Sequence, residues 1–229
     1  TDWWIDRLYD FAGGLGATTV RTDISRSVID VNRDPAGGSL YPGQATTELC
    51  PTTTFDGEPL YGAGGEPDET EIARRRGLYF TPYHTALQAE LDRLRARHRK
   101  VALYEAHSIR SVIPRLFDGE LPHFNIGTNS SASCDPALAA AVEQACGASA
   151  FSRVTNGRFK GGWTTRRYGR PEAGLHAIQM ELACRGYMDE PADPPTPHTW
   201  PSAYDPERAA PMRAALTQVL EAALAFACA

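Results

Sequence analysis

The sequence contains 229 residues, of which 42% are hydrophobic and 22% charged, and this composition is typical of a folded globular protein with a full core. The formal net charge of −5 argues against a nucleic-acid-binding surface, which needs clustered lysine and arginine. No apolar stretch reaches the roughly 18 residues of a membrane span, and the first residues lack the pattern of a signal peptide, so we expect neither a membrane anchor nor export.

The five cysteines are odd in number and form no Cys-x-x-Cys pair. The sequence therefore predicts neither a zinc cage built from thiolates nor a framework of paired disulfides. Free thiols are typical of a reducing compartment, so we expect a cytoplasmic protein.

The first part of the chain begins with an expected helix. Asp2 can cap this helix, and the apolar residues that follow have helical spacing up to the glycine pair at 13–14. Short strands are predicted over 17–21 and 25–33. Residues 34–68 are rich in glycine, proline and threonine, and a connection of this length is a candidate for shaping a binding site.

The rest of the chain alternates helices and strands. Pro82 is expected to kink or interrupt a long helix, while Asp135 and Asp205 each cap a helix that begins with proline. The expected elements are a helix over 69–99, strands over 101–104, 123–127 and 176–184, and helices over 136–147 and 206–226. This order predicts an α/β fold, with a mixed or largely parallel sheet and helices on both faces. In such sheets the ligand lies beyond the carboxyl ends of the strands.

Residues 25–33 read Ser-Arg-Ser-Val-Ile-Asp-Val-Asn-Arg and place Arg26, Asp30, Asn32 and Arg33 among apolar side chains. Because unpaired buried charge is costly, these groups must be satisfied by one another or by a ligand. Arginine binds a carboxylate through two parallel hydrogen bonds. The segment therefore predicts a site for an anionic small molecule.

His107 follows the apolar strand over 101–104, and Glu105 precedes it by two residues, which puts both side chains on one side of a continuing strand. A carboxylate usually orients a zinc-ligating histidine in this way. The alternative is a hydrogen-bonded histidine at a strand end that binds no metal.

Glu181 is the one ionisable residue in the otherwise apolar strand segment over 177–182. Burial would raise its pKa, and it could then act as a general base that takes a proton from a metal-bound water and returns it to a leaving amine. The alternative is a structural ion pair with one of the arginines.

The other histidines carry weaker hypotheses. His84 and His98 fall in the expected long helix and are predicted to be partly exposed. His176 is close enough in sequence to Glu181 to be a candidate for orienting it. The glycine-rich run over 156–162 lacks the Gly-Lys-Ser/Thr ending of a phosphate-binding loop, and we interpret it as a mobile loop that brings basic residues to the site.

Taken together, five segments closely resemble the N-formylglutamate amidohydrolase family, also called N-formylglutamate deformylase, in order and spacing across essentially the whole chain. The segments are 25–35 (Ser-Arg-Ser-Val-Ile-Asp-Val-Asn-Arg-Asp-Pro), 106–108 (Ala-His-Ser), 125–129 (Asn-Ile-Gly-Thr-Asn), 156–162 (Asn-Gly-Arg-Phe-Lys-Gly-Gly) and 176–182 (His-Ala-Ile-Gln-Met-Glu-Leu). The family is related to zinc carboxypeptidases and aspartoacylase. The resemblance implies a phosphorylase/hydrolase-like three-layer α/β fold, with a zinc site at the carboxyl ends of the central strands.

The resemblance also implies roles for individual residues. His107 would be a zinc ligand, and Glu181 would be the catalytic glutamate. Asp2 matches the family's aspartate near this helix start and would complete the metal site. The residues implied to bind the substrate carboxylates are Arg26, Asn32 and Arg33.

Family members normally begin with a strand whose Pro-His-x-Gly-type segment supplies the first zinc histidine, and no such segment precedes Thr1. We therefore expect one amidohydrolase domain over 1–229 that lacks its natural N-terminal strand. The expected activity is hydrolysis of N-formyl-L-glutamate to formate and L-glutamate in histidine degradation, with Zn²⁺ or another divalent metal. The alternatives are a hydrolase of another N-acyl amino acid, with residues 34–68 setting specificity, and a non-catalytic module that binds acyl amino acids.

Overall fold

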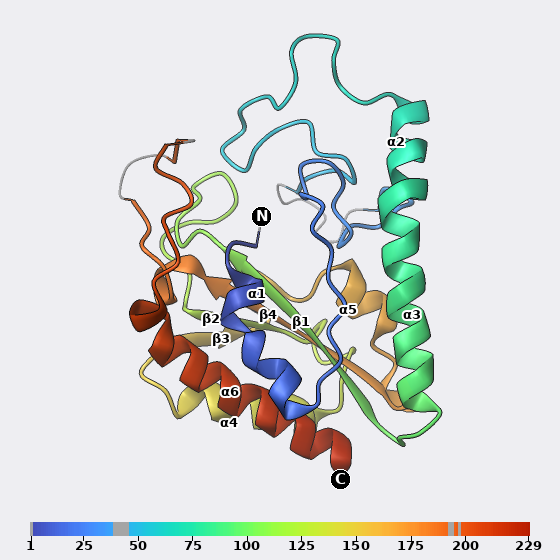
Figure 1. The fold of residues 1–229 in the computed structure, drawn as a ribbon, viewed down its shortest axis with the longest axis vertical. Helices are drawn as coiled ribbons and strands as arrows, with labels where there is room; N and C mark the ends of the chain where they lie inside the picture. Colours follow the sequence, from blue (N-terminus) through green and yellow to red (C-terminus); the bar gives the residue numbers. More distant parts are fainter. Residues whose placement is uncertain (1, 39–45, 192–194, 197) are drawn as a thin grey trace.

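A mixed sheet forms the centre of the computed structural model, which describes residues 2–38, 46–191, 195–196 and 198–229 (Figure 1). In the described residues the strand order is β1–β4–β2–β3. β1 and β4 are parallel, β2 is antiparallel to β4, and β3 is parallel to β2. The strand bounds are β1 Val101–Ile109, β2 Phe124–Gly127, β3 Arg153–Thr155 and β4 Leu175–Ala183. The predicted α/β fold with a mixed sheet is confirmed.

Helices α4 (Pro136–Gly147) and α6 (Pro206–Cys228) cover one face of the sheet. Asp135 and Asp205 cap them through side-chain hydrogen bonds, as their place before proline predicts. Alternate strand residues point into this layer and join its helices in the largest core cluster. These strand residues are Tyr104, Phe124, Ile126, Ile178, Met180 and Leu182.

Helices α3 (Thr81–Arg95) and α5 (Trp163–Tyr168) lie on the opposite face. Leu87 and Leu91 of α3 pack with Val101 of β1 and Tyr168 of α5 in a second, smaller cluster. The sheet is therefore the middle of three layers. No helix in the described parts of the chain is long and apolar enough to cross a membrane.

The long helix predicted over 69–99 is interrupted at the expected place. It comprises α2 (Glu69–Arg75), a π-helical segment η2 (Arg76–Phe80) and α3, which ends at Arg95. Pro82 has no N–H to donate and its ring crowds the preceding turn, which explains why that turn widens. Thr81 accordingly donates to the carbonyl of Arg76, five residues back.

Three expectations for local structure are wrong. Residues 17–21 and 25–33 are not strands, and the first helix is only α1 (Ile5–Leu8) followed by the 3₁₀ helix η1 (Asp10–Leu15). In the second segment the N–H groups of Val28 and Ile29 both donate to the Ser25 carbonyl, so the chain turns there. α5 (Trp163–Tyr168) follows directly after the glycine-rich run over 156–162. The remaining 3₁₀ turns are η3 (Pro171–Ala173) and η4 (Cys184–Gly186).

Candidate active site

Polar side chains gather on the sheet face that looks toward α3 and α5. Glu105 and His107 lie on β1, Gln179 and Glu181 on β4, and Asn125 on β2. Strand pairing places His107 beside Glu181, and Glu181 beside Asn125. Because side chains alternate between faces, these residues share the face opposite the main core. The structure thus brings these polar side chains together toward the carboxyl ends of β1 and β4, where the sequence predicts a ligand site.

His107 lies between two carboxylates. Its Nδ1 is 3.1 Å from Oδ1 of Asp2, and its Nε2 is 3.0 Å from Oε1 of Glu105. Asp2 does not cap α1; its Oδ1 also accepts from the backbone N–H of Ser108 at 2.9 Å. Burial lowers the pKa of His107, but Asp2 and Glu105 outweigh burial and hold that pKa well above its usual range. The same pairing lowers the pKa of Asp2 despite its burial.

Asp2 and His107 fit two positions of a zinc site. In a tetrahedral zinc site with bonds of about 2.0–2.2 Å, neighbouring ligand atoms lie roughly 3.3–3.6 Å apart, close to the 3.1 Å between Nδ1 and Oδ1. Glu105 would then orient the ring from its other nitrogen. The carboxylates meet opposite edges of the imidazole and cannot share an ion with it. Accordingly, the described ranges contain no cluster of three or more His, Cys, Asp or Glu side chains able to hold a metal.

Glu181 is 7% exposed, and its carboxyl group has the environment of a general base. Burial raises its pKa to about 7; His107 opposes this change, and Asp2 adds to it. Gln179 donates from Nε2 to Oε2 of Glu181 at 3.3 Å, and its Oε1 accepts from the backbone of Gly162 at 2.7 Å. Sequence reasoning missed Gln179, although its spacing of two before Glu181 repeats that of Glu105 before His107.

The charged side chains of residues 25–33 satisfy one another in part. Asp30, 3% exposed, accepts from Arg26 at 2.6 Å and lies 3.2 Å from Nε of Arg33. Arg33 also donates to Oγ1 of Thr47 at 3.0 Å. Asp2 and Glu181 both raise the pKa of Arg26, which places its guanidinium in the field of the site.

This buried ion network predicts acid sensitivity. Arg26 and Arg33 lower the pKa of Asp30 in the folded protein, although burial opposes them. The ionised Asp30 therefore stabilises the fold, and its full contribution is present at pH values above the pKa of an unfolded aspartate, about 3.9. That stabilisation is lost as pH falls through the lower folded value. Asp30→Asn should therefore lower the free energy of unfolding by about 3–5 kcal/mol at pH 7. Below about pH 3.9 the variant and the wild type should differ less in this free energy. Urea unfolding of both proteins from pH 7 to pH 3 measures the two free energies. If they differ by the same amount at every pH, Asp30 does not stabilise the fold through its charge.

Asn32 connects this segment to His107 and to the first turn of α5. Its Nδ2 is 3.1 Å from Nε2 of His107, and its Oδ1 accepts from the N–H of Thr164 at 2.9 Å. A Cβ on Gly162 would lie 2.3 Å from Nδ2 of Asn32, so only glycine permits this approach. From the same turn of α5 Thr165 donates to Oε2 of Glu105 at 2.5 Å. The start of α5 thus supplies a backbone N–H and a hydroxyl to the site.

The remaining histidines differ from expectation in two cases. His84 is buried, not partly exposed, and it hydrogen-bonds the Val31 carbonyl. His176 does not reach Glu181, because it lies on the other face of β4. There its Nδ1 accepts from the backbone N–H of Asp135, and Phe226 packs on its ring. His98 is exposed, as predicted.

A model of the N-formylglutamate amidohydrolase family matches residues 1–188 of the sequence. The chain belongs to this family. It is 50% identical over 227 residues to N-formylglutamate deformylase of Pseudomonas aeruginosa and 48% identical to that of Pseudomonas putida. Each alignment covers 99% of this chain and 82% of the relative.

The fold of this amidohydrolase also matches a solved structure. The crystal structure of N-formylglutamate amidohydrolase from Ralstonia eutropha JMP134 superposes with a TM-score of 0.75, at 22% identity, over 96% of this chain and 80% of that one. At this identity the match supports the three-layer architecture.

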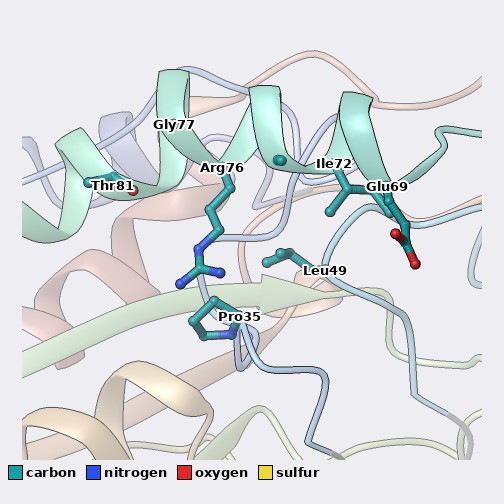
Figure 2. A pocket seen from close by; sticks show the side chains of 8 residues that line it. Pro35, Leu49, Glu69, Ile72, Arg76, Gly77 and Thr81 are labelled. Carbon is teal, nitrogen blue, oxygen red and sulfur yellow. The ribbon is translucent and has the colours of Figure 1, made fainter.

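The amidohydrolase has a further cavity of about 420 Å³, apart from the polar face of the sheet (Figure 2). It lies between the α2–α3 helix and the segments that carry Pro35 and Leu49, and the side chain of Arg76 extends toward Pro35. Neither His107 nor Glu181 lines it. The cavity is therefore separate from the polar side chains on the sheet face.

Proposed function

We propose that this protein hydrolyses N-formyl-L-glutamate to formate and L-glutamate with the help of a divalent metal, zinc being the expected ion. The observation that carries the proposal is the juxtaposition of three groups: the Asp2–His107 pair, the buried Glu181 beside it, and the arginines on either side of Asp30. Deformylases at 50% and 48% identity support the choice of substrate.

A metal bound by Asp2 and His107 would polarise the formyl carbonyl and acidify water. Glu105 holds the His107 ring from its second nitrogen, and Thr165 in turn holds Glu105. These contacts fix the imidazole orientation before substrate binds, so little free energy is spent on ordering it during the reaction.

Glu181 moves the proton. Its raised pKa of about 7 lets it accept a proton from the attacking water and return it to the nitrogen of the departing glutamate. The C–N bond of the formamide breaks, and one water is consumed for each formate released. Gln179 donates to Oε2 of Glu181 and so orients the carboxyl group.

The arginines provide recognition. Arg26 and Arg33 share Asp30, and guanidinium groups retain donors for a carboxylate when one edge is already bound. We call Arg26 and Arg33 the arginine clamp. Asn32 links this clamp to His107, so the position of the bound carboxylate is fixed relative to the reacting centre. We place the reaction at the last step of one route of histidine degradation.

The test is a panel of N-formyl, N-acetyl and N-formimidoyl derivatives of L-glutamate, with formate or amine release measured on the purified protein. We expect N-formyl-L-glutamate to give the highest kcat/KM, chelation to abolish turnover, and added zinc to restore it. Preference for the N-acetyl compound would instead support an acylase of another class. Turnover that is indifferent to chelation would overturn the metal requirement.

A further inference from the structure

His84 holds together two segments that build the site, although it touches no group of the reaction. It lies in the first turn of α3 and is 9% exposed. Its ring packs edge-on against Trp163, with 4.7 Å between ring centres, and is tilted against Phe80, with 4.3 Å between ring centres. A histidine enclosed by aromatic rings has a fixed orientation, so its two nitrogens point at defined partners.

Those partners define the protonation state of the ring. Nε2 is 2.8 Å from the Val31 carbonyl, which can only accept, so Nε2 carries the proton. Nδ1 is 3.0 Å from the hydroxyl of Tyr168, whose one proton is shared between this nitrogen and the His84 carbonyl oxygen at 3.4 Å. Burial lowers the pKa of His84, which keeps the ring neutral with one donor and one acceptor.

The two partners belong to segments that are far apart in sequence. Val31 lies between Asp30, which holds both arginines, and Asn32, which contacts His107. Tyr168 ends α5, the helix that begins with the residues contacting Asn32 and Glu105. His84 thus hydrogen-bonds both to the backbone next to the arginines and to α5, the helix that contacts Asn32.

We propose that His84 is a positioning residue for carboxylate recognition: its bond to the Val31 carbonyl fixes the backbone of residues 30–33 and so holds the arginine clamp in its binding geometry. The proposal rests on the proposed function for the identity of the ligand. The bracing itself is a property of the fold and can be measured without turnover.

The test compares His84→Leu with His84→Gln. Glutamine can place an amide N–H where Nε2 donates, whereas leucine fills the space without a donor. For N-formyl-L-glutamate we expect His84→Leu to raise KM by about 10-fold or more with kcat changed far less, because the clamp binds ground state and transition state alike. His84→Gln should recover most of the wild-type KM. Leu87→Val, one turn along α3, serves as a control for loss of packing and should keep the wild-type KM.

Amide hydrogen exchange provides the readout that does not depend on activity. In His84→Leu the N–H groups of Asp30 and Arg33, which donate to backbone carbonyls in the native fold, should exchange faster, while those of β1 and β4 should not change. Unchanged exchange at 30–33, or equal KM values for the leucine and wild-type proteins, would overturn the proposal. If exchange rises while the wild-type protein releases no formate, the bracing stands and the proposed function fails.

Discussion

Glu181→Gln is expected to lower kcat for formate release by about 10²–10⁴-fold while leaving the fold intact. Glutamine has the shape of glutamate but cannot accept a proton from water, so only the proton transfer is lost. Glu181 is buried with a raised pKa, so a neutral amide is no worse suited to its surroundings than the carboxylate. Steady-state kinetics gives the loss, and circular dichroism with thermal unfolding verifies the fold.

Glu143→Gln is the matched control for this prediction. Glu143 lies on α4, on the opposite side of the sheet, and accepts a hydrogen bond from Thr155. The same chemical change there should leave kcat within about twofold of wild type, since surface substitutions away from a site have small effects. A Glu181→Gln enzyme with wild-type turnover would eliminate the role assigned to Glu181.

Arg33→Met is expected to raise KM for N-formyl-L-glutamate by about 10–100-fold with a smaller change in kcat. A hydrogen bond to a charged group contributes about 1.5–3 kcal/mol, and the methionine keeps the apolar length of the side chain without its donors. Asp30 retains Arg26 as a partner in this variant, so the fold should persist. Steady-state KM and kcat, measured beside the folded fraction, provide the test.

Arg93→Met is the control for loss of one positive charge. Arg93 is exposed on α3 and pairs with Glu90 on the same helix. Its replacement should change neither KM nor kcat, because exposed ion pairs contribute little. Equal KM values for Arg33→Met and wild type would remove Arg33 from substrate binding.

The sequence predicts the layers of the fold because they depend on local patterns. The largely apolar run of β4 and the capping residues Asp135 and Asp205 give elements whose bounds agree with the structure to within about two residues. Residues 25–33 form two successive turns instead of the predicted strand, and their charges pair across these turns, between Arg26, Asp30 and Arg33. The spacing of apolar residues predicts strands and helices, but it contains no information on ion pairs between nearby charged residues.

Site contacts between distant segments were less accessible from sequence. Asp2 meets His107 across 105 positions, and no local pattern distinguishes that role from a helix cap. His84 is different, since it precedes Leu87 by three residues and Leu91 by seven. That spacing puts it on the buried stripe of α3 and is a signal of burial that the sequence contains.

A crystal structure of the Glu181→Gln protein with N-formyl-L-glutamate and zinc tests the central claim most directly. We predict that the formyl group lies between His107 and residue 181, with at least one carboxylate of the substrate on Arg26 or Arg33. Substrate bound instead in the cavity beside Arg76, with the polar face of β1 and β4 free of it, would contradict the assignment of the active site.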